Sequence, residues 1–424
     1  MEKDKVLSIL AEKQIEEETV NRQVLEIVEN VRRDGDSALK AYTEKFDGVL
    51  LENFEVSGAE IMAAYKSTPQ DLIDALERSK ANIEAYHKRQ VRETVIYKEG
   101  KQDIVLGQLI KPIEKVALYV PGGLAPYPSS VLMNALPAKI AGVDEVIMMT
   151  PPNKDGSISP VILAAAKIAG VDRIFKIGGA QGVAAFAYGT ETVPQVDKIV
   201  GPGNIYVATA KKIVSGTVGI DMVAGPSEIV VLADEWANPA FVAADLLSQA
   251  EHDERAASIL VTDSATLAER VEACLAEQVE KLDKKEICLK ALKNNGKIIL
   301  VNDMAYGVDL VNKIAPEHLE ILTRDPFEFY KKIRNAGAIF LGEYTPEPVG
   351  DYYAGTNHVL PTCGTARFNS ALSVDDFIVK TSLIYYSQSA LTQARADIEL
   401  IANAEGLTAH RNAVAIRFSE GGLK

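Results

Sequence analysis

Apolar residues recur every three or four positions through most of residues 1–95. Val20, Val24 and Val28 follow this spacing, and Leu72 and Leu76 repeat it farther along the chain. Such spacing places apolar side chains on one face of an α-helix. The pattern therefore predicts a helical N-terminal region.

From about residue 104 the pattern changes to short apolar runs that alternate with helical stretches. These runs, bounded by glycine, proline or polar residues, occupy 116–120, 145–149, 173–177, 198–200 and 228–232. Strands that alternate with helices form parallel sheets through right-handed crossovers, and ligands usually bind at the carboxyl ends of the strands. A parallel sheet is therefore predicted here.

A second strand–helix series runs from Asn238 to about Gly342. Asn238 and Pro239 are a favourable N-cap and first-turn pair for a helix that we expect to end near Glu254. Strands are predicted at 258–261, 297–301 and 338–341, followed by a loop-rich stretch at 343–370 and a helical tail. The pattern predicts an α/β fold with two domains and helical ends.

The composition is that of a globular protein with an acidic surface. The 424 residues are 47% hydrophobic and 25% charged, and the formal net charge is −14. A negative surface repels phosphate backbones and anionic lipid, so no nucleic acid or membrane partner is expected. No apolar run approaches the ~20 residues of a membrane span. The three cysteines, Cys274, Cys288 and Cys363, are far apart, which fits a reducing, cytoplasmic location rather than a disulfide framework.

Four of the five histidines accompany carboxylates, amides or glycine turns in the second half of the chain. The exception, His87, lies in a charged helical stretch and is expected at the surface. Gln249 and His252 are three residues apart on one predicted helix, so their side chains share a face. An amide oxygen and an imidazole can share a Zn²⁺ ion, although a polar helix end explains the same residues.

Glu317 and His318 are adjacent at a predicted helix start. A glutamate can activate water and a histidine can exchange the proton of an alcohol, whereas a carboxylate favoured by the helix dipole is the simpler explanation. Asp351 and His358 occupy a glycine-bounded loop, and His410 lies near the C-terminus, where a solvated helix is the simpler explanation.

Glycine turns follow three of the predicted strands, at 121–123, 178–179 and 201–203. Glycine lets the backbone approach a nucleotide closely, and the helix N-termini that follow favour its phosphates. None of these turns has the G-x-G-x-x-G spacing, so the motifs alone do not define a dinucleotide site.

Taken in order, these segments resemble the histidinol dehydrogenase family. The resemblance rests on YVPGG at 119–123, YPSSVLM at 127–133, GGAQ at 178–181, GPGN at 201–204, DMVAGPSE at 221–228, DLLSQAEH at 245–252, APEHLE at 315–320, GDYYAGTNHVLP at 350–361 and EGLTAH at 405–410. The segments extend over nearly the whole chain, so the set is far more specific than any one motif.

The resemblance implies that L-histidinol is oxidised to L-histidine in two NAD-dependent steps, through an aldehyde that stays bound. It implies catalytic roles for Glu317 and His318. The implied Zn²⁺ ligands are Gln249, His252, Asp351 and His410. The implied substrate contacts are these four ligands together with Ser227, His318, His358 and Glu405. The implied NAD contacts are Tyr119, Gln181 and Asn204.

The resemblance also implies two Rossmann-like parallel-sheet domains in a homodimer with shared active sites. Residues 1–15 would be a helical extension. Residues 16–118 and 229–371 would form the domain that carries most zinc and catalytic residues, and 119–228 the NAD-binding side. Residues 372–424 would be a helical tail that reaches the partner subunit.

Two other functions fit some of these residues. A zinc hydrolase could use Glu317 to activate water, but it would leave the glycine turns without a task. A non-catalytic relative could bind zinc and a partner for structure alone, but it would not need Glu317 and His318.

The route of the second oxidation is a separate question. A cysteine-based aldehyde dehydrogenase would form a thiohemiacetal. None of the three cysteines lies in a catalytic motif of the family, so a water-based second step is predicted.

Overall fold

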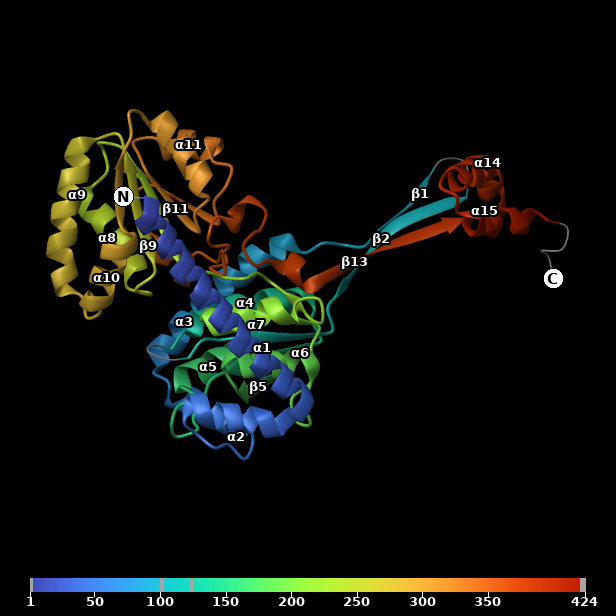
Figure 1. The fold of residues 1–424 in the computed structure, drawn as a ribbon, viewed down its shortest axis with the longest axis horizontal. Helices are drawn as coiled ribbons and strands as arrows, with labels where there is room; N and C mark the ends of the chain where they lie inside the picture. The colour runs from blue at the N-terminus through green and yellow to red at the C-terminus, as the bar shows by residue number, and fades with distance from the viewer. Residues whose placement is uncertain (1–2, 100–102, 123–125, 420–424) are drawn as a thin grey trace. The chain divides into compact units, whose positions relative to one another are not determined.

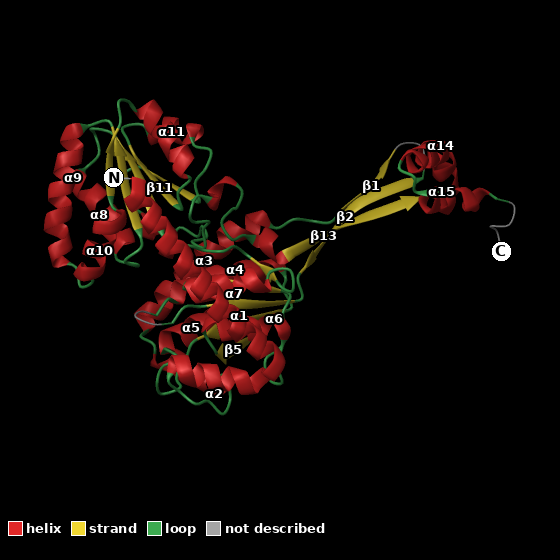
Figure 2. Cartoon of the chain, viewed as in Figure 1, coloured by secondary structure: helices red, strands yellow, loops and turns green. Residues whose placement is uncertain are grey.

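The computed structural model describes residues 3–99, 103–122 and 126–419, with side chains from residue 18 onward. The chain forms two compact units. The larger unit comprises Met1–Val91 and Ile113–Phe377, and the smaller unit comprises Arg92–Pro112 and Ile378–Lys424. Both units contain helices and strands (Figure 1; Figure 2).

The first sheet of the larger unit is parallel. Its strands are β3 (Lys115–Tyr119), β4 (Glu145–Thr150), β5 (Arg173–Lys176), β6 (Lys198–Val200) and β7 (Gly219–Ile220). They lie in the order β5-β4-β3-β6-β7. The chain proceeds outward from β3 to β5 and then returns to the other side of β3 as β6. The carboxyl ends of β3 and β6 therefore flank a topological switch point, the usual ligand position in such sheets.

Helices cover both faces of this sheet (Figure 1). On the face that carries Val116 and Leu118, the strands pack against α4 (Pro128–Ala141) and α5 (Pro160–Ala169). On the face that carries Ala117 and Tyr119, they pack against α6 (Gly179–Tyr188) and α7 (Ile205–Val214). A sheet buried on both faces needs uninterrupted apolar runs, which is why the sequence predicted these strands.

The N-terminal region is helical, as predicted, and it packs on the first sheet. Helix α1 (Lys3–Asp47) contributes Val24, Val28 and Leu39 to the core that contains Ala117. Helices α2 (Gly58–Ser67) and α3 (Gln70–His87) join the core on the opposite face. Gly35 interrupts α1 with a φ of +54°.

This packing differs from the predicted domain boundaries. The resemblance groups residues 16–118 with 229–371, and the boundary after residue 118 falls inside β3. Because β3 pairs with β4 and β6, and its side chains share cores with α1, α2 and α3, residues 18–91 belong with the first sheet.

His87 is not the surface residue that the charged flanking sequence predicted. The side chain is fully buried, and its Nδ1 lies 2.9 Å from the backbone oxygen of Ile83. The last turn of α3 faces the core, so the local charge pattern was a poor guide to its environment.

The second sheet of the larger unit is also parallel. Its strands are β8 (Glu228–Ala233), β9 (Ala257–Thr262), β10 (Lys297–Leu300), β11 (His318–Leu322) and β12 (Ala338–Leu341), in the order β10-β9-β8-β11-β12. The accompanying helices are α8 (Pro239–Ala250), α9 (Ala265–Gln278), α10 (Lys285–Asn295), α11 (Met304–Ile314), α12 (Pro326–Phe329) and α13 (Glu347–Tyr352).

Two local predictions in this region were wrong. Glu317 and His318 do not begin a helix, because His318 is the first residue of β11, which β8 and β12 enclose on both edges and whose five residues are all buried. The helix α8 ends at Ala250, so His252 lies in the turn beyond it instead of on the helix.

The smaller unit contains an antiparallel sheet. Its strands are β1 (Val95–Glu99), β2 (Ile104–Pro112) and β13 (Ile378–Tyr386), in the order β1-β2-β13, and two helices follow, α14 (Gln388–Ala404) and α15 (Thr408–Ala415). The predicted tail at 372–424 is therefore helical only in its later part. Residues 378–386 form a strand because they pair along their length with β2, far away in the sequence.

The predicted α/β class with two parallel sheets is confirmed. In the part of the chain that the structure describes, no helix combines the length and the apolar character that crossing a membrane requires.

Candidate active site

A cavity of about 380 Å³ lies at the amino end of the second sheet. Its wall includes Glu317 and His318 at the start of β11, Ser227 just before β8, and Gln249 near the end of α8. The loop at 201–204, from the carboxyl end of the first sheet, lines it as well. The rule that ligands bind at the carboxyl ends of parallel strands therefore applies here to the first sheet only.

The turn before β11 brings Glu317 and His318 to this wall. Helix α11 is followed by its C-cap residue Ala315, which has a φ of 54° in the left-handed region. This conformation is unfavourable for a residue with a Cβ, and such strain is concentrated at functional sites. The side chains that follow are held in place by burial, with exposed fractions of 6% for Glu317 and 4% for His318.

The His318 ring is held in one tautomer. Its Nδ1 lies 3.3 Å from the backbone oxygen of Glu228, and because a carbonyl only accepts, Nδ1 carries the proton. The other nitrogen, Nε2, is buried without a hydrogen-bond partner among the described groups. Burial lowers the pKa of His318 to about 3, so the ring is neutral. A neutral imidazole with an unused lone pair is suited to accept a proton.

The carboxyl group of Glu317 lies on the Nδ1 side of the His318 ring. Its Oε2 accepts a hydrogen bond from the backbone nitrogen of Glu228 at 2.9 Å and lies 3.7 Å from Nδ1 of His318. Burial, together with the charges of Glu228, Asp351 and Glu347, raises the pKa of Glu317 well above its usual range. A carboxyl group in such surroundings binds a proton more strongly than an ordinary one, as a general base must.

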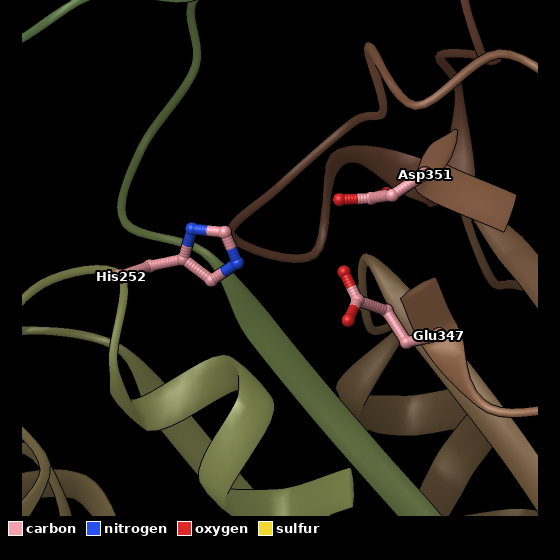
Figure 3. Close-up of side chains that lie close together, drawn as sticks. All are labelled: His252, Glu347 and Asp351. Carbon is pink, nitrogen blue, oxygen red and sulfur yellow. The ribbon is translucent and has the colours of Figure 1, made fainter. Parts of the chain in front are cut away.

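Three side chains in this cavity could hold a metal ion. The ligand atoms of His252, Glu347 and Asp351 all lie within 4.8 Å of one another. Figure 3 shows the imidazole of His252, from the turn after α8, directed toward the two carboxylates of α13. Glu347 and Asp351 are four residues apart on this helix, so they project from the same face.

Gln249 adds an amide to the same cavity wall. The side chain is fully buried, and neither Oε1 nor Nε2 has a hydrogen-bond partner among the described groups. A buried polar group left unpaired costs roughly 1–3 kcal/mol, which a bound ion or ligand would offset. Imidazole, carboxylate and amide oxygen together form a donor set that fits Zn²⁺.

The carboxyl groups of this site lie largely buried beside one another. Burial, followed by the charge of Asp351, raises the pKa of Glu347 to about 8, and burial raises the pKa of Asp351 to about 6. Asp351 Oδ1 lies 3.9 Å from Nδ1 of His358, and burial lowers the pKa of His358 to about 4. A divalent cation would reverse the shifts of the carboxyl groups, because it favours their ionised form.

Sequence reasoning did not identify Glu347 as part of the site. Its backbone nitrogen donates to Oε1 of Glu320 at 2.7 Å, and Glu320 is itself buried against Asp245. The four-residue spacing between Glu347 and Asp351 is the available signal, but it matters only in a helix, and the sequence predicts a loop-rich stretch here.

A larger cavity of about 1100 Å³ lies at the carboxyl end of the first sheet. It is lined by Tyr119, the last residue of β3, by Gln181, in α6 after β5, and by Asn204, after β6. Tyr119 Oη accepts a hydrogen bond from the backbone nitrogen of Gly179 at 3.2 Å. Pro121, like Asn204, lines both cavities, so the two adjoin. Gly123, in the first predicted glycine turn, lies outside the described residues.

The remaining predicted residues are divided between the two units. His358 lines the smaller cavity of the larger unit, as Ser227 does. Glu405 and His410 belong to the smaller unit, where Glu405 caps α14 and His410 is an exposed residue of α15.

The cysteines do not line the smaller cavity. Cys274 lies on α9 and Cys288 on α10, as predicted. The backbone nitrogen of Cys363 donates to Oε1 of Glu228, and burial followed by the Glu228 charge raises the pKa of the Cys363 thiol. A raised pKa disfavours the thiolate that nucleophilic catalysis requires.

The fold and the site define an α/β protein of two parallel sheets in which a proton-accepting histidine adjoins a group of potential metal ligands. The sequence model of the histidinol dehydrogenase family matches residues 10–418, and the chain belongs to this family.

Individual relatives agree with this assignment. The histidinol dehydrogenase of Clostridium acetobutylicum is 55% identical, over 98% of this chain and 96% of the relative. That of Streptococcus mutans is 53% identical, over 98% and 97%. The crystal structure of histidinol dehydrogenase from Elizabethkingia anophelis superposes with a TM-score of 0.89 at 40% identity, covering 93% of this chain and 91% of that one.

Proposed function

We propose that this chain oxidises L-histidinol to L-histidine through a bound aldehyde, with two molecules of NAD and a Zn²⁺ ion, in histidine biosynthesis. The observation that carries the proposal is the cavity in which the unpartnered Nε2 of His318 adjoins the unpartnered amide of Gln249 and the group around His252. Family membership supplies the substrate class.

The zinc ligands of the proposal are Gln249, His252 and Asp351 from one subunit and His410 of the partner subunit. When bound, Zn²⁺ would act as an anchor for the imidazole and amine of histidinol, and NAD would accept a hydride in each of the two oxidations. Ser227 and His358, which line the same cavity, contact the substrate.

In the first oxidation the hydroxyl proton of histidinol passes to Nε2 of His318 as hydride leaves the carbon. This assignment follows from the tautomer, because Nδ1 carries the proton that faces Glu228 and only Nε2 is a base. Burial keeps the pKa of His318 low, so the ring starts the step neutral and can pass its proton on afterwards.

In the second oxidation water adds to the aldehyde carbon, and Glu317 accepts a proton from that water. The raised pKa of Glu317 supports this role, because the ionised form of such a carboxyl group is a stronger base toward that water than an ordinary carboxylate. Loss of hydride from the hydrate leaves a carboxylic acid, which releases its remaining proton to give the carboxylate of histidine. The water thus supplies the second carboxylate oxygen.

The larger cavity is proposed to bind NAD. It lies at the topological switch point of the first sheet and contains Tyr119, Gln181 and Asn204. Because it adjoins the smaller cavity at Pro121, NAD held there would supply the hydride acceptor for a substrate in the smaller cavity.

In the proposed function the protein is a homodimer, and each active site contains residues from both subunits. Glu405 and His410 belong to the smaller unit, which also exposes large apolar residues, including Ile384, Tyr385 and Ile401. Exposed apolar surface of this kind is typical of an interface. Glu405 is proposed to contact the substrate bound by the partner subunit.

A zinc hydrolase is the alternative with some structural support, because Glu317 lies beside the potential metal group. It leaves the 1100 Å³ cavity without a ligand. The deciding experiment is an assay at the NADH absorbance band with L-histidinol and NAD, with and without a chelator. Chelator-sensitive NADH formation is expected, and no NADH from zinc-loaded protein would refute the proposed function.

A further inference from the structure

The larger cavity has a carboxylate in its wall that none of the assigned roles uses. Asp47 is the last residue of α1, and it lines the cavity together with Tyr119 and Gln181. Its side chain is half-buried, so a ligand in the cavity can reach the carboxyl group. Its Oδ2 is shielded from water and has no hydrogen-bond partner among the described residues, so a ligand would contact the other carboxylate oxygen.

The position of Asp47 is unfavourable for a negative charge. It lies at the C-terminus of a helix, where the helix dipole disfavours anions. Lys45, two residues earlier, lies over the ring of Phe46, and none of the ion pairs found between described residues includes Asp47. Burial raises the pKa of Asp47 to about 6, and the charge of Asp47 contributes to the raised pKa of Tyr119. The fold therefore stabilises this carboxylate poorly, as is typical of a group that a ligand contacts.

The chemistry of the group restricts its ligand. An ionised carboxylate only accepts hydrogen bonds, and it repels phosphate. A ribose offers hydroxyl groups as donors, whereas a ribose that carries a 2′-phosphate offers a second negative charge in their place. Lys45 and Lys154 line the same cavity and would supply positive charge to a bound pyrophosphate.

We propose that Asp47 accepts a hydrogen bond from the adenosine ribose of NAD and thereby selects NAD over its 2′-phosphorylated form. The proposal rests on the proposed binding of NAD in the larger cavity. Asp47 contacts the cofactor far from the reacting carbon, so it affects binding of the dinucleotide and not the hydride transfer itself.

The test compares Asp47→Asn and Asp47→Ala with Glu44→Gln, a control that removes an exposed charge on the same helix outside the cavity. Hydrogen bonds to charged groups contribute enough for a roughly tenfold to hundredfold change in affinity. The KM for NAD should rise by at least about tenfold in both Asp47 variants, with kcat changed less than about twofold, and the preference for NAD over NADP should shrink. The control should behave as wild type.

Thermal unfolding of the Asp47 variants separates a role in cofactor binding from a purely structural role. Because the pKa of Asp47 is raised in the folded protein, its charge destabilises the fold above pH 6, and this cost disappears as the pH falls through 6 toward 4. Asp47→Asn should therefore raise the unfolding temperature at pH 7.5 and lose that advantage at pH 4. An Asp47 that served only the fold would give a lower unfolding temperature and an unchanged KM for NAD.

The outcomes distinguish this proposal from the function on which it rests. Wild-type protein that makes no NADH from histidinol would refute the proposed function. Normal turnover by the wild type, with an unchanged KM for NAD and an unchanged NADP discrimination in both Asp47 variants, would refute the role of Asp47 alone.

Discussion

Nε2 of His318 and Oε1 of Glu347 face each other at 3.9 Å, and neither atom has a hydrogen-bond partner among the described groups. Both side chains are almost completely buried. The distance is too long for a direct hydrogen bond, so a hydroxyl group or water between them could contact both. In the proposed function, the reacting oxygen of the substrate would lie between these two atoms.

Glu347→Gln should weaken zinc binding, because the carboxylate lies within 4.8 Å of His252 and Asp351. Loss of a group that close to metal ligands typically lowers metal affinity about tenfold to a hundredfold. The zinc-free variant should also unfold at a higher temperature than zinc-free wild type at pH values above the ordinary pKa of a glutamate. The buried Glu347 carboxyl group, with its pKa raised to about 8, must there take up a proton or carry an unfavourable charge in the folded protein, whereas an amide needs neither. Zinc titration and thermal unfolding measure both effects. Glu343→Gln, an exposed neighbour, is the control, and unchanged zinc affinity in Glu347→Gln would contradict the prediction.

Removal of zinc should abolish turnover and leave a folded protein, because the proposed ligands come from separate segments around a cavity and the sheets pack without them. His252→Ala should lose zinc and activity together. Metal content, circular dichroism and NADH formation are the measurements, with the exposed Glu254→Gln as control. Full activity of zinc-free His252→Ala would rule out this ligand.

Glu317→Gln should mainly slow oxidation of the aldehyde, whereas His318→Gln should slow oxidation of the alcohol as well. General acid–base roles are usually worth ~10²–10⁴-fold in rate. Single-turnover NADH formation from histidinol and from histidinal separates the two steps. Equal, small losses in both steps of Glu317→Gln would refute this division of roles.

A variant in which Cys274, Cys288 and Cys363 are all replaced by serine or alanine should retain near-normal turnover. None of the three thiols lines the smaller cavity, and the pKa of the Cys363 thiol is raised. Steady-state kinetics tests the variant, and Cys288→Ala is preferred to serine there because that side chain is fully buried. A covalent adduct of the aldehyde on any of these cysteines would show that the water route is wrong.

Mixed dimers should reveal whether His410 acts in the partner's site. In a mixture of His410→Ala and His252→Ala proteins, a shared site would give each mixed dimer one site with both lesions and one with neither. Activity should then return to as much as half of the wild-type value per mixed dimer. If each subunit used its own His410, every site would keep one lesion. An inactive mixture with demonstrated subunit exchange would end the shared-site proposal.

The sequence by itself determined the two parallel sheets. Strands such as 145–149 and 228–232 are buried on both faces, so an uninterrupted apolar run was sufficient to identify them. The amphipathic spacing of Val24 and Val28 likewise identified α1, and the ordered motifs identified the family.

Only the tertiary structure decided which distant segments meet. Local periodicity reports that a segment has a buried face, but not which other segment covers it. The packing of α1 on the first sheet, the pairing of 378–386 with β2 and the burial of His87 all depend on such distant partners. The same holds for Glu347 and Asp47, because each became a candidate only when the fold placed its carboxylate in a cavity wall without a partner for every oxygen.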